Sequence, residues 1–369
     1  MYKTYLDLHI SYRLKGSDSL NILILTAKFG IGHVSVSEAI REEILLTYPH
    51  ATIHVVDVIA YLFPHLNKWI YGGFNFMVTK CAFIYNMFNK ITARYSHMPF
   101  KTIMTHKIEQ MLKMYEANFI ITTCPVCPQY ISTYKEMKQD DIPLYTYITD
   151  IMVHEEWIAS QTDFYFVGAE KTKLDLLQKG VSASKIKVCG IPVKHCFKCS
   201  SQEKKDKRLA KREVLIMGGG LGLISSPDHF LKQLSRREDI KLTMITGHNT
   251  KLCSRVKKKF PSIEVIGFTN HVADYMKRAD LLVTKSGGIT MFEAIHTQTP
   301  LYIINPFLIQ EIENAKYIEE ARIGRVIWSS KRQEVTRDIL ELLENREDQQ
   351  RMKDNMKNIN NHFTNSSPL

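Results

Sequence analysis

Leu20–Ala27 reads LNILILTA, and the turn Gly30-Ile-Gly32-His33 follows it. An uninterrupted apolar run of this length is typical of a strand that is buried on both faces. Apolar residues at helical spacing come next, and Thr52–Ile59 (TIHVVDVI) then has the pattern of a second strand. A strand, a glycine turn, a helix and a strand make a βαβ unit, so these residues predict a parallel sheet.

The same alternation continues along the chain and then starts again. In the first half, further strands are predicted at Phe119–Thr122, Pro143–Thr149, Phe164–Val167 and Lys187–Cys189, with a helix at Glu170–Lys179. In the second half, strands are predicted at Glu213–Met217, Lys241–Thr246, Ile263–Ile266, Leu281–Thr284 and Leu301–Ile304. The sequence therefore predicts an α/β fold of two Rossmann-like, doubly wound domains.

The domain boundaries follow from the length and from a basic stretch. A chain of 369 residues is long for one hydrophobic core. We expect residues 1–195 to form the first domain, 196–212 a basic linker, and 213–345 the second domain. The remaining tail, 346–369, is predicted to be a helix, and its packing back on the first domain stays open.

The composition is that of an ordinary globular protein, with 44% hydrophobic and 24% charged residues. No apolar run approaches the ~18 residues of a membrane-spanning helix, and the N-terminus lacks the apolar core of a signal peptide. We therefore expect a cytoplasmic protein with reduced thiols. The pairs Cys124/Cys127 and Cys196/Cys199 have zinc-ligand spacing, but such pairs are often incidental, and we predict no metal site.

The net charge of +11 suits an anionic partner, which is nucleic acid, an acidic membrane surface or a phosphorylated ligand. Residues 61–100 interrupt the strand–helix alternation with many aromatic and basic side chains. They are interpreted either as core-facing helices or as a surface that touches lipid.

Two glycine turns predict a phosphate site. Gly218–Gly222, which includes Gly219 and Gly220, follows a buried strand and allows the backbone to approach a ligand closely. After the strand Leu281–Thr284, a second turn opens a helix whose amides and hydroxyls favour a diphosphate. The residues expected to bind there are Ser286, Gly287, Gly288, Ile289 and Thr290, with Glu293 on a ribose diol. By itself, Glu293 is better explained as an acidic residue serving the helix dipole.

Polar residues also follow the next strand. Gln310, Glu311 and Asn314 come after Leu301–Ile304, at the carboxyl end where α/β sheets bind ligands. Three such side chains suit the hydroxyls of a sugar. The sequence therefore predicts a nucleotide diphosphate that carries a sugar.

These residues resemble a known family. Ser286-Gly-Gly-Ile-Thr-x-x-Glu293-Ala, followed by Gln310-Glu311-x-x-Asn314-Ala, is similar to the donor site of GT-B glycosyltransferases of the MurG and monogalactosyldiacylglycerol synthase type. Gly30-x-Gly32-His33 resembles the family's glycine-rich turn, and Thr149-Asp150-x-x-x-His154-x-x-Trp157 resembles a signature of its diacylglycerol branch. The resemblance is stronger to processive diacylglycerol glucosyltransferases than to MurG.

The resemblance implies roles for individual residues. His33 is the first candidate for the general base or a diphosphate contact, together with Gly32, and Asp150 is the second candidate base. His154 and Trp157 are expected on the acceptor side, although Trp157 is also explained as loop packing. Phe268 is expected to contact the uracil.

The implied activity is inverting transfer of a hexosyl group from a UDP-sugar to diacylglycerol or a glycosyl-diacylglycerol. The UDP-sugar is then a co-substrate, with no tightly bound cofactor, and the enzyme acts at the inner face of the cell membrane. One alternative is another UDP-sugar enzyme of the same fold, such as a MurG-like transferase or an epimerase. A remote alternative is a basic nucleic-acid-binding protein, although we expect no nucleic-acid partner.

Overall fold

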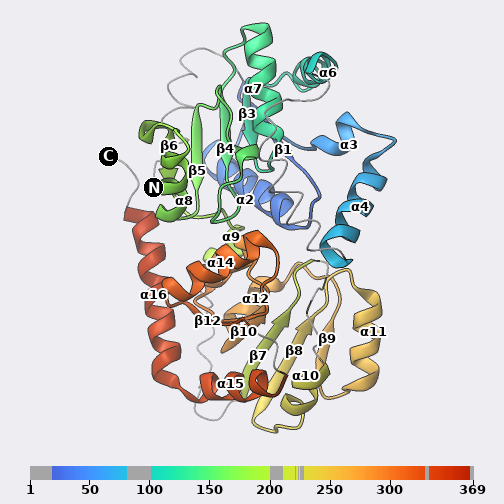
Figure 1. Cartoon of the computed structure of the whole chain (residues 1–369), viewed down its shortest axis with the longest axis vertical. Helices are drawn as coiled ribbons and strands as arrows, with labels where there is room; N and C mark the ends of the chain where they lie inside the picture. The colour runs from blue at the N-terminus through green and yellow to red at the C-terminus, as the bar shows by residue number, and fades with distance from the viewer. Residues whose placement is uncertain are drawn as a thin grey trace. The chain divides into compact units, whose positions relative to one another are not determined.

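The computed structural model describes residues 19–80, 101–199, 211–220, 222, 224, 228–328 and 332–365. The chain divides into two compact units. The first comprises Met1–Lys194 with His362–Leu369, and the second comprises His195–Asn361. Each unit has its own parallel sheet with helices beside it (Figure 1).

The sheet of the first unit has, within the described residues, six parallel strands in the order β2-β1-β3-β4-β5-β6. The strands are β1 Asn21–Thr26, β2 Thr52–Asp57, β3 Phe119–Thr122, β4 Leu144–Tyr147, β5 Phe164–Val167 and β6 Ile186–Val188. The helical elements are α2 Gly32–Thr47, α3 Val58–Leu62, α4 Asn67–Lys80, α6 Lys101–Met114, α7 Cys127–Lys138, η1 Glu155–Trp157, α8 Glu170–Gln178 and η2 Ala183–Lys185. Strand β1 is central, which explains its unbroken apolar run: Leu23, Ile24 and Leu25 have no exposed surface.

The sheet of the second unit repeats this plan in the order β12-β11-β10-β7-β8-β9. Its strands are β7 Arg212–Met217, β8 Ile240–Ile245, β9 Glu264–Ile266, β10 Leu281–Thr284, β11 Leu301–Ile304 and β12 Gly324–Ile327. Its helices are α9 His195–Lys198, α10 Asp228–Leu234, α11 Thr250–Lys259, α12 Val272–Arg278, α13 Gly288–Thr297, α14 Ile309–Glu320, α15 Arg332–Glu344 and α16 Arg346–Asn365. The predicted pair of doubly wound parallel sheets is confirmed.

Both sheets contain a point at which the strand order reverses. In the first unit the chain moves outward from β1 to β2 on one side and from β3 to β6 on the other, so the reversal lies between β1 and β3. In the second unit the same logic places it between β7 and β10. At such points the loops that leave the strands turn to opposite faces of the sheet and open a crevice for ligands.

The structure differs from the sequence-based expectation at two places. The edge strand β12 was not predicted, and residues 334–363, whose sequence predicts an amphipathic helix, form two helices, α15 and α16. Asn345 separates them, because its side-chain oxygen accepts a hydrogen bond from the backbone N–H of Asp348 (3.0 Å) and so caps the second helix. The last residues of α16, from His362 on, belong to the first unit, where Phe363 packs against a hydrophobic cluster.

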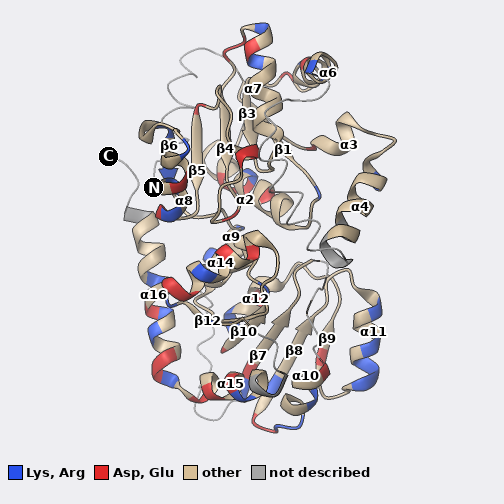
Figure 2. Cartoon of the chain, in the orientation of Figure 1, with Lys and Arg blue, Asp and Glu red and all other residues tan. Residues whose placement is uncertain are grey.

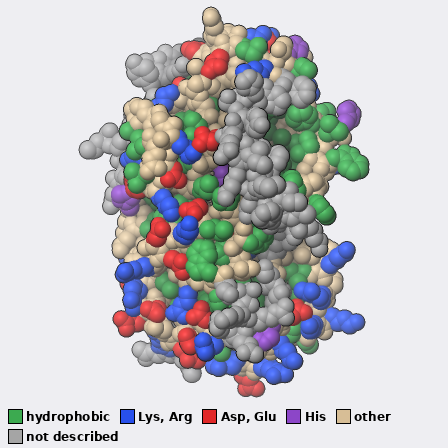
Figure 3. Space-filling model, viewed as in Figure 1, with side chains coloured by type: hydrophobic (Ala, Val, Ile, Leu, Met, Phe, Trp, Pro, Cys, Tyr) green, Lys and Arg blue, Asp and Glu red, His purple; other side chains and the backbone are tan. Residues whose placement is uncertain are grey.

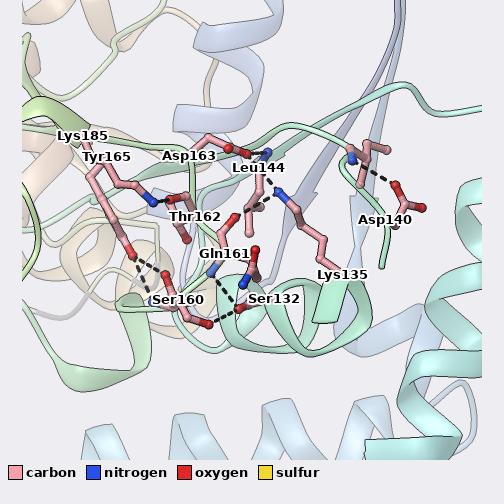
Figure 4. Close-up of polar contacts among 12 residues, drawn as sticks. Ser132, Lys135, Asp140, Leu144, Ser160, Gln161, Thr162, Asp163, Tyr165 and Lys185 are labelled. Atoms are coloured by element: carbon pink, nitrogen blue, oxygen red, sulfur yellow. Dashed lines mark hydrogen bonds and ion pairs between the residues drawn. The ribbon is translucent and has the colours of Figure 1, made fainter. Parts of the chain in front are cut away.

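A polar cluster ties α7 to the amino ends of β4 and β5 (Figure 4). The buried Lys135 ammonium donates to the Asp163 carboxylate and to the Gln161 carbonyl, both at 3.0 Å. Asp163 also accepts from the N–H of Leu144 at 2.8 Å. The ion pair is therefore fully hydrogen-bonded at the edge of the sheet opposite the carboxyl ends, and it has a structural role.

Candidate functional site

His33 lies at the reversal point of the first sheet. It follows β1 in the first turn of α2, and its Nδ1 lies 2.8 Å from the carbonyl oxygen of Thr123, the residue after β3. Ser37 reinforces this link, because its hydroxyl donates to the His33 carbonyl (3.0 Å) and lies 2.8 Å from the Thr123 hydroxyl. The predicted catalytic histidine is thus held between the two strands that flank the crevice.

These contacts determine the state of the imidazole. A carbonyl oxygen only accepts hydrogen bonds, so Nδ1 carries the proton and Nε2 of the neutral ring keeps its lone pair. Burial lowers the pKa of His33 below its ordinary value of 6.5, while the nearby Asp150 carboxylate and the bond to Thr123 act in the opposite direction. His33 is therefore neutral near pH 7, and an adjacent carboxylate is present to stabilise the charge that the ring acquires when it accepts a proton.

The loop after β4 supplies the remaining predicted residues of this unit. The Thr149 hydroxyl oxygen lies 3.1 Å from Nδ1 of His33, and Asp150, partly buried, follows it. The partly buried His154 begins the short helix η1, where its carbonyl accepts from the N–H of Trp157. The structure thus brings His33 and Asp150 together.

Trp157 requires a correction. It has no exposed surface and packs in a cluster with Ile148, Val153 and Tyr165. Its ring centroid lies 6.3 Å from that of His33. A buried indole cannot line the entrance for an acceptor in this conformation, so Trp157 supports the loop behind His33 instead.

In the second unit, the glycine turn after β7 packs against the loop after β8. The N–H of His248 donates to the carbonyl of Gly220 (3.0 Å), and that of Gly222 donates to the carbonyl of Gly219 (2.9 Å). Gly222 has a φ of +61°, and a Cβ there would lie 2.2 Å from the carbonyl oxygen of Thr246. The loops therefore need a residue without a side chain at this position.

The turn after β10 presents a helix start without a side-chain cap. Gly287 is the N-cap residue of α13, and no side chain bonds to the first amides of the helix. These amides have no acceptor within the helix, so they are oriented for an anion. Thr290 and Glu293, three residues apart on one face, are the partly exposed residues of the first two turns, whereas Gly288 and Ile289 are buried and offer only backbone groups.

Two residues predicted to bind ligand have structural bonds instead. The buried Ser286 hydroxyl donates to the carbonyl of Glu311 (2.6 Å), so its single proton is not available to a diphosphate. Asn314 is fully buried, and its amide nitrogen donates to the carbonyl of Ser286 (2.9 Å). Together they fasten the turn after β10 to α14, and the contact of Asn314 with a sugar stays a prediction.

Glu311 and Gln310 begin α14 beside that turn. The Glu311 carboxylate is largely buried and forms an ion pair with Lys285, whose ammonium lies 5.5 Å from the ring centroid of Phe307. Direct contact of Glu311 with a sugar is therefore not what the structure shows. Gln310 is partly buried at the carboxyl edge, where it was predicted.

Phe268, in the loop after β9, is 53% exposed. The ring of His248 stacks on it, with centroids 4.5 Å apart and planes at 12°. An exposed aromatic ring that is already supported on one side suits the π-stacking of a nucleobase.

The sequence reasoning missed residues that hold the predicted ones in place, namely Thr123, Lys285 and His248, and it gave Thr149 no role. Each follows a strand, which is a usable signal, but their partners become known only with the strand order. Among the described residues, no group of three or more His, Cys, Asp or Glu side chains is arranged to hold a metal ion. Both CxxC pairs consist of free thiols.

Comparisons with known proteins agree with this arrangement. Residues 33–193 match the family model of monogalactosyldiacylglycerol (MGDG) synthase, and residues 213–366 match that of the glycosyltransferase family 28 C-terminal domain. A processive diacylglycerol beta-glucosyltransferase of Staphylococcus epidermidis is 30% identical over 322 residues, which cover 83% of this chain and 80% of the relative. A protein of the same name from Bacillus licheniformis is 28% identical over 371 residues, which cover 95% of this chain and 93% of the relative.

The fold is shared with solved structures. MurG of Acinetobacter baumannii superposes with a TM-score of 0.57 at 14% identity, covering 94% of this chain and 99% of MurG. S. aureus MnaA, solved with UDP, gives a TM-score of 0.60 at 15% identity, covering 93% and 95%.

Two doubly wound units of this kind form a GT-B fold. The family models and the curated relatives identify the chain as a glycosyltransferase. It belongs to the glycosyltransferase family 28 group that contains the processive diacylglycerol beta-glucosyltransferases and the monogalactosyldiacylglycerol synthases. The resemblance inferred from the motifs is therefore confirmed.

Proposed function

We propose that this enzyme transfers a hexosyl group from a UDP-sugar, UDP-glucose or UDP-galactose, to diacylglycerol or a glycosyl-diacylglycerol, with inversion at the anomeric carbon. Family membership supports the substrate classes. One observation carries the chemistry: the Nδ1 proton of His33 is committed to the Thr123 carbonyl, which leaves Nε2 as a base at the crevice of the first unit.

The second unit is the proposed donor site. The uncapped start of α13 and the turn Gly218–Gly222 hold the diphosphate through backbone amides, because both flank the reversal point of this sheet. Glu293 accepts from the ribose hydroxyls, Phe268 stacks on the uracil, and Gln310 contacts the sugar. Ser286, Glu311, Asn314 and Lys285 keep the turn in position for this.

The proposed reaction has one displacement step. The acceptor hydroxyl oxygen forms a bond to the anomeric carbon while the bond from that carbon to the diphosphate oxygen breaks. The acceptor proton passes to Nε2 of His33, and the electron pair leaves with UDP. The Asp150 carboxylate and the Thr123 carbonyl stabilise the imidazolium, and the amides at α13 stabilise the leaving diphosphate.

The proposed membrane contact is the outer face of α4. Trp69 is 80% exposed and Phe76 is 61% exposed. The two residues are seven positions apart, so they lie on the same face of the helix, and Leu66 continues this face just before the helix begins. The sequence of α4 contains no acidic residue, and Lys68 lies beside Trp69. Figure 3 shows hydrophobic side chains on the side of the first unit where α3 and α4 lie. Aromatic residues with flanking lysines suit the interface of an anionic bilayer. Residues 81–100 of the predicted lipid-facing segment lie outside the described residues.

Basic side chains offer a second attraction to anionic lipid. Helix α11 exposes Lys251, Lys257 and Lys258, and basic residues run along it (Figure 2). Within the described residues, no helix has the length and apolar content that crossing a membrane requires. We therefore propose a peripheral attachment to the inner face of the cell membrane.

The test is UDP release from a UDP-sugar in the presence of diacylglycerol vesicles. Release should depend on the lipid and should fall by about 10²–10⁴-fold in His33→Ala, since a general base contributes that much. His106→Ala, at an exposed site on α6, is the matched control and should keep the wild-type rate. UDP release that is independent of lipid, or unaffected by His33→Ala, would exclude the proposed chemistry.

A further inference from the structure

The turn that leads to His33 is fastened to α4. The backbone N–H of Lys28 donates to the Tyr71 hydroxyl oxygen (3.1 Å), and this hydroxyl donates to the Asp57 carboxylate (2.5 Å). Asp57 ends β2, and its carboxylate also accepts from the N–H of Ala60 (3.1 Å) as the N-cap of α3. One phenol therefore joins the loop after β1, the end of β2 and α4.

Phe29 adds an apolar contact to the same junction. Its ring packs edge-on against Tyr71, with centroids 5.2 Å apart, and lies 4.8 Å from the ring of Phe74. Gly30 follows with a φ of +92°, and α2 with His33 begins at Gly32. The residues that contact α4 are thus separated from His33 by only a few residues of the chain.

Helix α4 has two faces with different partners. Tyr71 and Phe74 point to the body of the first unit, whereas Trp69 and Phe76 are exposed. Between them, Gly72 and Gly73 have open space around them, and each glycine costs a helix about 1 kcal/mol relative to alanine. The helix is therefore weak by itself and depends on packing contacts for its stability.

We propose that Tyr71 is a positioning residue that couples contact with a lipid surface to the placement of His33. When the outer face of α4 rests on a bilayer, the helix is fixed, and Tyr71 and Phe29 hold the turn Lys28–Gly30 in the geometry that aims His33. Away from the bilayer, α4 and the turn fluctuate, and the base is misplaced. This inference rests on the proposed function.

Support comes from the chemistry of the phenol. Burial and the hydrogen bond to Asp57 raise the pKa of Tyr71, so its hydroxyl stays protonated and donates at all working pH values. The Lys28 ammonium, 3.8 Å from Asp57, balances the charge of the carboxylate. The junction is therefore a charge-assisted hydrogen bond, which is stronger than a neutral one.

The test compares Tyr71→Phe with Tyr134→Phe. Tyr134 also donates to an aspartate (Asp140, 2.7 Å), but on α7 at the opposite edge of the sheet. Each variant is assayed with diacylglycerol in anionic vesicles and with a water-soluble short-chain diacylglycerol. Tyr71→Phe should lower kcat on vesicles roughly tenfold, as expected for a lost hydrogen bond to a charged group, and leave KM for the UDP-sugar unchanged. Its rate with the soluble acceptor should match that of the wild type.

The outcomes separate the inference from the proposed function. If the wild type makes no lipid product from either acceptor, the proposed function fails. If the wild type is active but Tyr71→Phe keeps its vesicle rate, or Tyr134→Phe loses as much, the coupling is wrong while the function stands. Phe29→Leu keeps the hydrogen bonds of Tyr71 and removes the aromatic contact, and it should also lower the rate on vesicles. This variant replaces Tyr71→Phe in the test if Tyr71→Phe fails to fold.

Discussion

His33 accepts a proton only while its imidazole is neutral, so the rate must depend on pH. Because burial lowers the pKa of His33 below 6.5, the ring stays neutral through pH 7 and becomes protonated only in more acidic solution. We expect kcat/KM to be level near neutral pH and to fall on the acid side with an apparent pKa below 6.5. A pH–rate profile at subsaturating UDP-sugar measures it.

Asp150→Asn supplies the control for this assignment. The Asp150 carboxylate raises the pKa of His33, so its removal should move the acid limb to lower pH and reduce kcat, since the imidazolium loses its stabilising charge. An acid limb that moves to higher pH would contradict the pairing of these two groups.

The variant Ser286→Ala tests whether this buried hydroxyl stabilises the fold or binds the ligand. Ser286→Ala leaves the Glu311 carbonyl without its donor, which should lower the free energy of unfolding by about 1–3 kcal/mol. Urea denaturation measures this loss, and UDP titration calorimetry measures affinity. A strong loss of UDP affinity with unchanged stability would instead show that the Ser286 hydroxyl binds the diphosphate. Thr290→Ala, on the partly exposed face of α13, should show the opposite pattern.

The sequence located these residues better than it assigned their roles. His33, Asp150, Thr290 and Glu293 lie in the loops or first helical turns that come after β1, β4 and β10, and periodicity identifies these strands. The donor of Ser286 is used by a carbonyl 25 residues away, and the indole of Trp157 is enclosed by a cluster from several elements. Such contacts depend on tertiary packing, which local pattern does not reveal.

Among the elements, the glycine turn after β7 offers a matched pair. Gly219 and Gly222 have φ values of +66° and +61°, but only a Cβ at Gly222 meets neighbouring backbone. Gly219→Ala should cost about 1–2 kcal/mol of stability through backbone strain alone. Gly222→Ala should cost about 1–3 kcal/mol more and weaken UDP binding, because the loop after β8 must move. Equal losses in urea denaturation would argue against the close packing.

Helix α4 makes a second prediction at this scale. In a Trp328→Phe background, Trp69 is the exposed tryptophan, since Trp157 is buried. Its emission should shift to shorter wavelength when anionic vesicles are added, and the shift should shrink as salt screens the lipid charge.

Trp69→Ala should weaken vesicle binding about tenfold or more, as burial of a large apolar side chain is worth ~1.5–3 kcal/mol. Leu46→Ala removes another exposed apolar side chain, on α2, and should bind like the wild type. Unchanged Trp69 emission would exclude this face of α4.

Element boundaries were predictable where strands are central and less so at the edges. β3, β5, β10 and β11 were predicted within their observed bounds, because continuous burial gives an unbroken apolar run. In the edge strand β12 Val326 is buried and the other three residues are partly exposed, and Gly324 lies close to Leu301, so the apolar pattern is weak. The break at Asn345 depends on a cap within a sequence that is otherwise helical.

At the scale of the molecule, both units have the same doubly wound strand order but different residues at the point where this order reverses. The first unit has His33, the proposed base, at its reversal point, and the second has glycines and an uncapped helix start at the equivalent point. An inverting glycosyl transfer needs both functions, a base for the acceptor and a site for the leaving diphosphate. The sequence predicts that the strand–helix pattern occurs twice. It does not predict the order of the strands in each sheet, and this order locates the two reversal points.

The central claim is that the chain moves a hexose from UDP to diacylglycerol. The most direct measurement incubates it with UDP-sugars labelled in the hexose and diacylglycerol in anionic vesicles, then identifies the lipid product by mass spectrometry and its anomeric configuration by NMR. We predict a labelled β-linked hexosyl-diacylglycerol from an α-linked donor. Label that stays in the aqueous phase as free or epimerised sugar nucleotide, or an α-linked lipid, would contradict the account.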